Sequence, residues 1–403
     1  MDPKRPWVLT AWLVPISLLS CSTPHVQVYY FAIAGVGAFA VTYLLGRGFD
    51  TASIGVMLAA SNILSCILQP AIGAYVDRTS VARLQTLIPA SLTASFAMLG
   101  ALELIPMPKL LEGLCYIFGY LTFSITMPLC NSLCAYYSRK GSHVNYGAGL
   151  GVGSVFFSFG SLAFGYVIAQ LGATAMIVFV LLLLIVQLVL VMRYPRVQPE
   201  APSGAAQGRT DSLSMAAFLG RYKLFVLTMT GVAFLAACHA MSENFLIQIF
   251  TRIGGGSENV GVALFLACIT AAPAQLYFER IQRRLSAVLL LRISGVFFML
   301  KVILLIFAKT VPSVYTIFLL QTFTYGFLYP PLYYLVLQRI DVKDMAKGQT
   351  LASAMFSLGM AMGNLLGGVA VENWGLNPML ALAAVIACAG TLLVNVTVRR
   401  KEA

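Results

Sequence analysis

The chain has 403 residues, of which 59% are apolar and only 10% are Asp, Glu, Lys or Arg. Soluble globular chains have about 45–50% apolar and about 25% charged residues, so this composition excludes a water-soluble enzyme and is typical of a polytopic membrane protein. The 26 basic and 14 acidic residues give a net charge of +12. We interpret this excess as a topology signal, so no nucleic-acid partner is predicted. The eight cysteines have no CxxC spacing, and neither a metal site nor a cofactor is expected.

The N-terminal segment, residues 1–24, contains the apolar run WVLTAWLVPISLLS, which is shorter than the about 20 residues that a spanning helix needs. One interpretation is a signal peptide with a poor lipoprotein cleavage box before Cys21. The sequence favours an interfacial helix with Trp7 and Trp12 at the level of the lipid headgroups, or a start codon placed too far upstream.

After this segment, twelve apolar stretches of about 20 residues each predict twelve transmembrane helices. The predicted helices cover residues 25–45, 52–76, 84–104, 112–137, 146–169, 173–193, 222–250, 259–278, 286–308, 312–337, 347–371 and 377–398. The fold class is therefore expected to be all-α, a polytopic membrane protein.

A polar stretch rich in Pro, Gly, Ala and Ser divides the predicted helices into two sets of six. This stretch, residues 194–221, is predicted to be a cytoplasmic linker between a bundle at 25–193 and a bundle at 222–398, with a tail at 399–403. Most Lys and Arg residues fall on one side of the membrane if both termini are cytoplasmic, which predicts that orientation in the cell membrane.

The two sets of helices repeat each other in sequence. Glu279 lies 202 residues after Asp77, at the matching end of the matching helix, and Gly368 lies 203 residues after Gly165. A nearly constant offset indicates two pseudo-symmetric six-helix bundles. Two similar bundles around a central cavity can rock between two open states, so the repeat predicts a transporter.

A motif in the loop between the second and third helices carries a resemblance to a known family. Gly73 is followed by Asp77-Arg78 and then Arg83, and the second half has Glu279-Arg280 in the matching place. Over residues 25 to 400 the chain resembles the major facilitator superfamily, whose loop has the form G-x-x-x-D-R-x-x-x-x-R. The resemblance implies that Asp77, Arg78, Arg83, Glu279 and Arg280 form a cytoplasmic gate held by ion pairs; the alternative is a basic loop that reflects topology alone.

The stretches at 146–166 and 348–368 look like the branch that contains the lactose permease, nucleoside–proton symporters and phenylpropionate-permease-like proteins. The chain departs from that branch in two places. Ala148 stands where the fifth helix of the branch often has the first arginine of its F/Y-G-R-x-R pattern, so the Arg–Glu sugar clamp is not expected. Gln321-Thr322-Phe323-Thr324 stands where the tenth helix often has a histidine. The G-P-x-x-G signature of drug–proton antiporters is absent from the fifth helix, which argues against drug efflux.

Three ionisable residues lie inside predicted helices, where a charge costs several kcal/mol unless it is paired or hydrated. His239 and Glu243 share one face of the seventh helix, and Lys301 lies at a similar depth in the ninth. We expect Glu243 to bind and release a proton, with His239 and Lys301 adjusting its proton affinity. The alternatives are a static Glu243–Lys301 pair and a Glu243 side chain that reaches the outer interface.

Polar and aromatic residues of several helices could line the substrate cavity. The candidates are Tyr29, Tyr30, Asn62, Gln69 and Asn131 in the first half and Asn244, Gln275, Gln321, Thr324, Tyr325 and Asn364 in the second. For any one of them, a hydrogen bond between helices is the competing interpretation. The aromatic tenth helix would suit a sugar, a nucleoside or an aromatic acid.

Together these features predict a secondary transporter that moves a small organic solute by alternating access, as a monomer in the lipid bilayer. Proton-coupled symport is the favoured mode, and an exporter or uncoupled facilitator is the alternative. A transporter-like sensor or an integral-membrane enzyme is a more distant alternative. The chain has no G-x-x-x-x-G-K-[ST] run for nucleotide binding, and its three histidines are widely separated in sequence.

Overall fold

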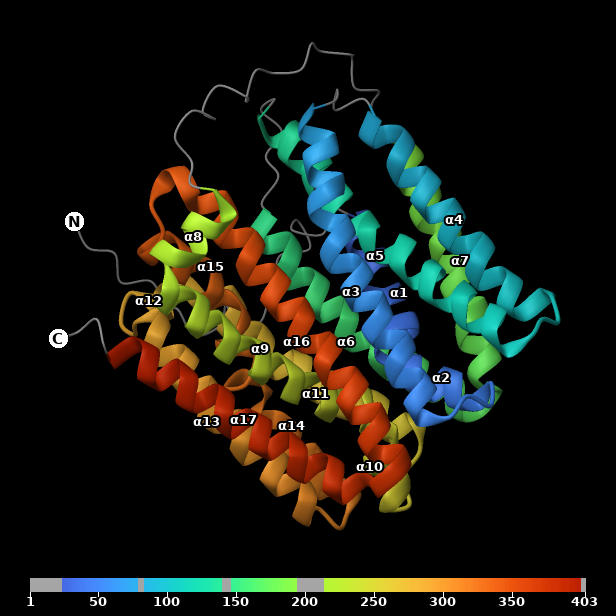
Figure 1. Cartoon of the computed structure of the whole chain (residues 1–403). Coiled ribbons are helices and arrows are strands. Elements are labelled where there is room, and N and C mark those ends of the chain that lie inside the picture. The colour runs from blue at the N-terminus through green and yellow to red at the C-terminus, as the bar shows by residue number, and fades with distance from the viewer. Residues whose placement is uncertain (1–23, 79–82, 140–145, 194–213, 400–403) are drawn as a thin grey trace, which may run out of the picture.

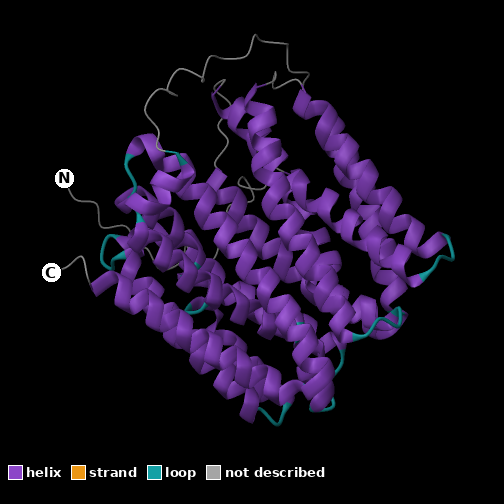
Figure 2. Ribbon diagram, viewed as in Figure 1, coloured by secondary structure: helices purple, strands orange, loops and turns teal. Residues whose placement is uncertain are grey.

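The computed structural model describes residues 24–78, 83–139, 146–193 and 214–399, and this part of the chain is helical without any strand (Figures 1 and 2). The expectations for residues 1–23 and for most of the linker lie outside these ranges. Eleven helices are long and apolar enough to cross a membrane, and the bent pair His25–Ala38 and Ala40–Gly46 makes a twelfth. The all-α, twelve-helix prediction is confirmed.

The first half contains α1 Pro24–Ile33, the π-helix η2 Ala34–Ala38, α2 Ala40–Gly46, α3 Thr51–Arg78, α4 Leu84–Leu104, α5 Lys109–Arg139, α6 Tyr146–Leu171 and α7 Ala173–Met192. The second half contains α8 Met215–Arg221, α9 Lys223–Asn244, α10 Leu246–Arg252, α11 Ser257–Leu276, α12 Phe278–Gln282, α13 Ala287–Phe307, α14 Val311–Phe318, η4 Leu319–Thr322, η5 Tyr325–Phe327, α15 Tyr329–Arg339, η6 Val342–Asp344, α16 Met345–Trp374 and α17 Leu376–Arg399.

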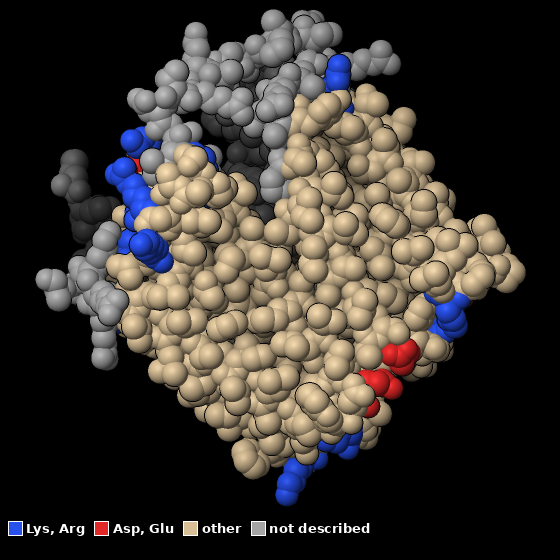
Figure 3. All heavy atoms as spheres, in the orientation of Figure 1, with Lys and Arg blue, Asp and Glu red and all other residues tan. Residues whose placement is uncertain are grey.

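The side of the molecule is an apolar belt, as expected of a surface that faces lipid. In α7, with a mean hydropathy of 3.2, Phe179 and Leu182 are exposed while Val180 and Leu184 are buried against the rest of the half. Lys and Arg gather at the two ends of the molecule, and an uncharged surface lies between them (Figure 3). An apolar outer surface cannot face water over such an area, so the helices cross a bilayer.

The first predicted helix is not the continuous span that its apolar run suggests. A π-helical stretch, Ala34–Ala38, interrupts it, and the two parts are bent by 49°. The close approach of α7 requires the glycine here, because a Cβ at Gly35 would lie 2.7 Å from Val180 Cγ2. The hydroxyl of Tyr116 donates to the carbonyl oxygen of Val36 at 2.6 Å, and this bond satisfies a backbone acceptor in the π segment.

The tenth predicted helix, 312–337, is also broken. It consists of α14, the 3₁₀ turns η4 and η5, and α15, and Thr324 between the turns has non-helical angles of φ −85° and ψ −93°. Pro330 and Pro331 lack the N–H groups that would bond to the carbonyls of Gly326 and Phe327, so a helix cannot run through this point and α15 begins anew.

The two halves meet along two helix pairs, α3 with α16 and α6 with α11. Both pairs cross at glycines: a Cβ at Gly55 would lie 3.0 Å from Gly368 Cα, and a Cβ at Gly165 would lie 2.9 Å from Gly261 Cα. We call the end where α3 begins the Thr51 end, and the opposite end, where α7 ends, the linker end. Both crossings lie toward the Thr51 end, because Gly55 is in the second turn of α3 and Gly261 in the second turn of α11.

Candidate functional site

The structure brings the three ionisable residues together inside the second half. Lys301 of α13 donates to Glu243 Oε1 of α9 at 2.5 Å, and Nδ1 of His239 lies 3.8 Å from the same oxygen. The Lys301 side chain is fully buried and the Glu243 side chain is 10% exposed. Glu243 therefore lies inside the bundle, and a side chain extended to the outer interface is excluded in this conformation.

The break in the tenth span places polar groups beside Lys301. Lys301 Nζ donates to Gln321 Oε1 at 2.7 Å, and the hydroxyl of Thr324 donates to the same oxygen at 3.1 Å. Ser294 of α13 donates to the carbonyl of Thr324 at 2.8 Å. Unwound backbone is tolerated at membrane depth only where protein or water satisfies it, and here α13 does so.

The ammonium group of Lys301 has a further partner in Phe318. Its Nζ lies 3.9 Å from the centroid of the Phe318 ring, within the range of a cation–π contact. Lys301 is thus held by a carboxylate, an amide oxygen and an aromatic face. Loss of any one of the three would leave the other two in place.

An aromatic row continues from this cluster. The ring of His239 stacks on Tyr325 with centroids 4.9 Å apart, and Tyr325 stacks on Tyr329 at 5.8 Å. Phe356 of α16 contacts both tyrosines edge-on. The Nδ1 atom of His239 is buried and has no hydrogen-bond partner among the described residues, so it is available to a polar group that enters the site.

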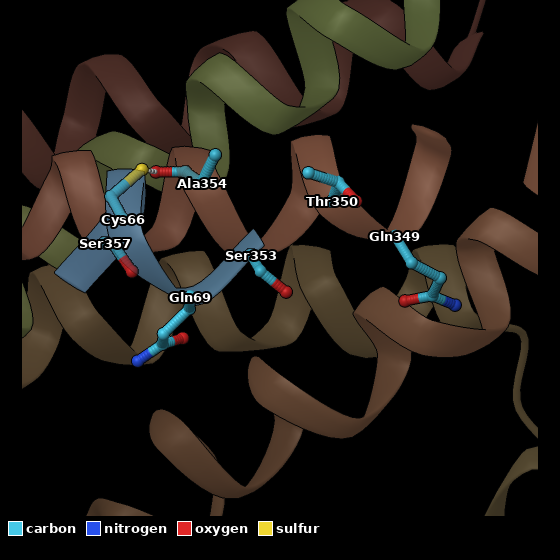
Figure 4. Close-up of a pocket in the computed structure, with 7 residues that line it drawn as sticks. All are labelled: Cys66, Gln69, Gln349, Thr350, Ser353, Ala354 and Ser357. Carbon is cyan, nitrogen blue, oxygen red and sulfur yellow. Dashed lines mark hydrogen bonds between the residues drawn. The ribbon is translucent and has the colours of Figure 1, made fainter. Parts of the chain in front are cut away.

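A cavity of about 240 Å³ lies between the halves (Figure 4). The described lining residues come from α3 and α16, and none of them is charged: Cys66, Gln69, Gln349, Thr350, Ser353, Ala354 and Ser357. Cys66 donates to the Ala354 carbonyl across the halves. Of these residues, only Gln69 was predicted from the sequence. The spacing of Gln349, Ser353 and Ser357 was an available signal, because a residue every four positions lines one helix face.

Most of the other cavity candidates are occupied by contacts within one half. Tyr29 is buried and stacks on Phe123 at 4.7 Å, and Asn62 donates to the Leu58 carbonyl of its own helix at 2.9 Å. Both contacts lie within the first half, and a place for these residues in the solute cavity stays a prediction.

The remaining candidates divide between the interface of the halves and the interior of one half. Asn244 donates to Asn364 at 2.5 Å, between α9 and α16, and Ser154 donates to Gln275 across the halves at 3.3 Å. Tyr30 packs so closely on Gly153 of α6 that a Cβ there would clash with its ring. The side chain of Asn131 lies outside the described residues.

The predicted gate residues are only partly described. The side chains of Asp77, Arg78 and Glu279 lie outside the described residues, although their backbone is helical. Arg83 donates to the Tyr75 hydroxyl at 2.6 Å, and the Arg280 guanidinium lies 5.3 Å from the Tyr277 ring centroid. The described basic side chains of the motif thus contact tyrosines, and the proposed ion pairs stay a prediction.

Comparison with known proteins identifies the family. The model of the MFS_1 like family matches residues 25–380, and the chain belongs to that family. No curated protein matches the sequence.

Solved structures show the same fold at low sequence identity. A point mutant of the nucleoside transporter NupG superposes with a TM-score of 0.76 at 16% identity, covering 93% of this chain and 98% of that one. The human organic anion transporter MFSD10 gives 0.63 at 16% identity, covering 93% and 100%. A POT family transporter in complex with 5-aminolevulinic acid gives 0.67 at 12% identity, covering 92% and 94%. The protein is a multi-pass membrane protein with the major facilitator fold.

Proposed function

We propose that this protein moves a small uncharged organic solute across the cell membrane by alternating access of its two halves, with proton movement coupled through Glu243. The linker end then faces the cytoplasm, in agreement with the distribution of Lys and Arg in the sequence. The observation that carries the proposal is the buried Glu243–Lys301–Gln321 cluster beside a broken helix.

The partners of Lys301 favour coupling over a static ion pair. Protonation of Glu243 would remove the charge that faces Lys301, and breaking a buried pair normally destabilises a protein by about 3–5 kcal/mol because the remaining charge is unpaired. Lys301 would keep Gln321 and the Phe318 ring. Because Lys301 keeps these two partners, the Glu243 carboxylate can change its protonation state, as a coupling site requires.

The location of the cluster also gives the proton a connection to the solute. His239 lies beside Glu243 and stacks on Tyr325, whose ring contacts Phe356 of α16. A solute stacked on this aromatic row would lie one side chain away from Glu243. Its binding can therefore favour one protonation state of Glu243, which is the differential interaction that coupling needs.

The solute class follows from the walls of the site. Among the described residues that line the cavity between α3 and α16, the hydrogen-bonding groups are uncharged, and the aromatic row offers ring faces. A neutral solute with a flat ring and several hydroxyls fits both features. NupG, which has a similar fold, is a nucleoside transporter. Nucleosides are therefore the first compounds to test, followed by sugars, and aromatic acids serve as the charged comparison.

The test is uptake into proteoliposomes with an imposed pH gradient, with a panel of labelled nucleosides, sugars and aromatic acids. We expect accumulation that follows the proton gradient for one compound class. In the Glu243→Gln variant, we expect accumulation to fall at least about tenfold while exchange of labelled for unlabelled solute continues, since exchange needs no net proton release.

Glu103→Gln is the matched control. Glu103 is also a 10% exposed carboxylate with a basic partner, Arg47, but it lies in the first half at the Thr51 end. It should retain gradient-driven accumulation. Full accumulation by Glu243→Gln would exclude coupling through Glu243. Gradient-independent movement by the unmodified protein would favour the facilitator or exporter, with Glu243–Lys301 as a static pair.

A further inference from the structure

The first residue of α3 is held by two helices of the other half. The backbone N–H of Thr51 donates to Glu372 Oε2 of α16 at 2.9 Å, and Gln248 of α10 donates to the Thr51 hydroxyl at 3.4 Å. The first N–H groups of a helix have no partner within the helix. Glu372 thus caps a helix that belongs to the opposite half, and Thr51 is only 7% exposed.

The cap lies one turn beyond a close backbone contact. A Cβ at Gly55 would lie 2.6 Å from the Asn364 carbonyl oxygen, and a Cβ at Gly368 would lie 2.6 Å from the Thr51 carbonyl oxygen. Glu372 is four residues after Gly368 and lies on the same face of α16. The glycines allow α3 and α16 to touch, and the carboxylate bonds to the end of α3 at the edge of this contact.

The second crossing shows that the packing does not require a carboxylate. Gly165 of α6 approaches Gly261 of α11 as closely as Gly55 approaches Gly368. Four residues after Gly165, however, the chain has Ala169. The same backbone contact therefore forms without an acidic cap. The hydrogen bond from Thr51 to Glu372 is thus an interaction that the helix packing does not require.

Toward the linker end, the same helix pair encloses a cavity. Cys66 and Gln69 of α3 face Ser353 and Ser357 of α16 across it (Figure 4). The α3–α16 pair is therefore closed at the Thr51 end and hollow further along. Glu372 is exposed, so water can solvate its carboxylate when the bond opens, and the bond can break and form again in every cycle.

We propose that Glu372 is the positioning residue that holds the Thr51 end of the two halves closed, through its bond to the Thr51 N–H. This inference rests on the proposed alternating access, because a latch matters only if the two halves separate. It assigns Glu372 no contact with the solute and no part in proton coupling.

Thr51 offers a matched pair of variants. Thr51→Pro removes both the hydroxyl and the N–H, whereas Thr51→Ala removes only the hydroxyl. Proline is favoured at the first position of a helix, so α3 can still form in Thr51→Pro. A difference between these two variants therefore reports the Glu372 bond. Glu372→Ala removes the same bond from the other side.

The readout is the distance between the halves at the Thr51 end, measured by double electron–electron resonance in nanodiscs. Spin labels at L110C and F307C, in a background without the eight native cysteines, lie on α5 and α13, where the native side chains are 78% and 71% exposed. We expect Thr51→Pro and Glu372→Ala to lower the ratio of closed to open molecules about three- to tenfold, as for loss of one typical hydrogen bond. Thr51→Ala, which removes only the long 3.4 Å bond from Gln248, should shift the ratio much less.

Equal distance distributions in all four proteins would overturn the proposal, and so would an identical shift in Thr51→Ala and Thr51→Pro. Gel filtration of each variant shows that it is folded. The distances are read without solute or pH gradient, so failure of the latch and failure of proton-coupled uptake are separate results. A shift in protein that shows no gradient-driven uptake would support the latch and count only against symport.

Discussion

The polar cluster of the second half has an apolar counterpart in the first. Lys301 of α13 donates to Gln321, and the residues that lie 202 positions earlier are Leu99 and Gly119. This pair is also in contact, since a Cβ at Gly119 would lie 3.0 Å from Leu99 Cδ2. The repeat thus keeps the contact and changes its chemistry. The packing of these two positions therefore does not depend on a charge.

The broken helices of the two halves differ in the same way. In the first half, the π segment is closed by one neutral bond, from Tyr116 to Val36. In the second half, the break in the tenth span surrounds Gln321 and Thr324, which bond to each other and to the charged cluster. Both halves bend, and among the described residues the bend of the second half is the one that lies beside a carboxylate and an ammonium group.

The largest effect is expected for removal of one charge from the second half. Lys301→Met would leave Glu243 buried without its cation and should lower the free energy of unfolding by about 3–5 kcal/mol. The double variant Lys301→Met/Glu243→Gln should recover most of this loss, because neither charge remains. Thermal unfolding in detergent measures the stability of the single and of the double variant. A double variant no more stable than the single one would show that the charges do not act as a pair.

A charge placed in the first half should also destabilise it. Leu99 is fully buried, and Leu99→Lys would put an ammonium group near Gly119, one turn from Glu103, a carboxylate that already pairs with Arg47. We therefore expect a cost of about 2.5–3.5 kcal/mol, as for a charge at membrane depth. Leu99→Met, which keeps volume and polarity, should be close to the unmodified protein. Yield of monodisperse protein and its melting temperature are the measurements. Equal stability of both variants would mean that the first half tolerates a charge at this position. The difference in chemistry between the two halves would then not affect stability.

These contrasts also show what could be predicted from the sequence. Charged residues stand out in apolar spans, and helix geometry places Glu243, His239 and Lys301 at one depth, so their proximity was expected. The breaks in the first and tenth spans were missed because hydropathy does not change when an apolar segment unwinds. Pro330-Pro331 was the available signal for the second break.

The contact between Thr51 and Glu372 could not be expected from local patterns. The two residues are 321 positions apart, and each stands at the end of an apolar run, where polar residues are ordinary. Only the packing of α3 on α16 makes them neighbours. The cavity had a weaker signal in Gln349, Ser353 and Ser357, but this spacing is also common on helices that pack without a ligand.

A smaller effect is expected at the bend of the first half. Tyr116→Phe removes the only described side-chain donor to the Val36 carbonyl, and a buried acceptor without its partner should lower stability by about 1–2 kcal/mol. Tyr120→Phe is the control, because its ring stacks beside Tyr116 at 6.4 Å and its hydroxyl has no bond among the described residues. Chemical or thermal unfolding compares them. Equal losses would show that ring packing, and not the bond to the π segment, holds the bend.

The smallest effect concerns the caps of the two matching helices at the Thr51 end. Asp50 precedes α3 and accepts from the Ser53 hydroxyl at 2.6 Å and from the Ser53 N–H at 2.8 Å. These bonds, the hydroxyl first, hold the pKa of Asp50 below its usual value. At the start of α11, the neutral side chain of Asn259 accepts from the Gly256 N–H at 2.8 Å instead. Of these two hydrogen-bonded caps, the one at α3 therefore uses a carboxylate and the one at α11 a neutral amide.

Because the pKa of Asp50 is lower in the folded protein than in the unfolded chain, its contribution is complete above the unfolded value of about 3.9 and is lost as the pH falls through the folded value. We expect the unmodified protein to exceed Asp50→Asn in stability by about 0.3–1 kcal/mol near pH 7. The difference should shrink below about pH 4. Glu372 bonds to the same helix end in both proteins, so its own titration largely cancels in the difference. A difference that stayed constant to about pH 3 would mean that the cap acts through hydrogen-bond geometry alone, as in α11.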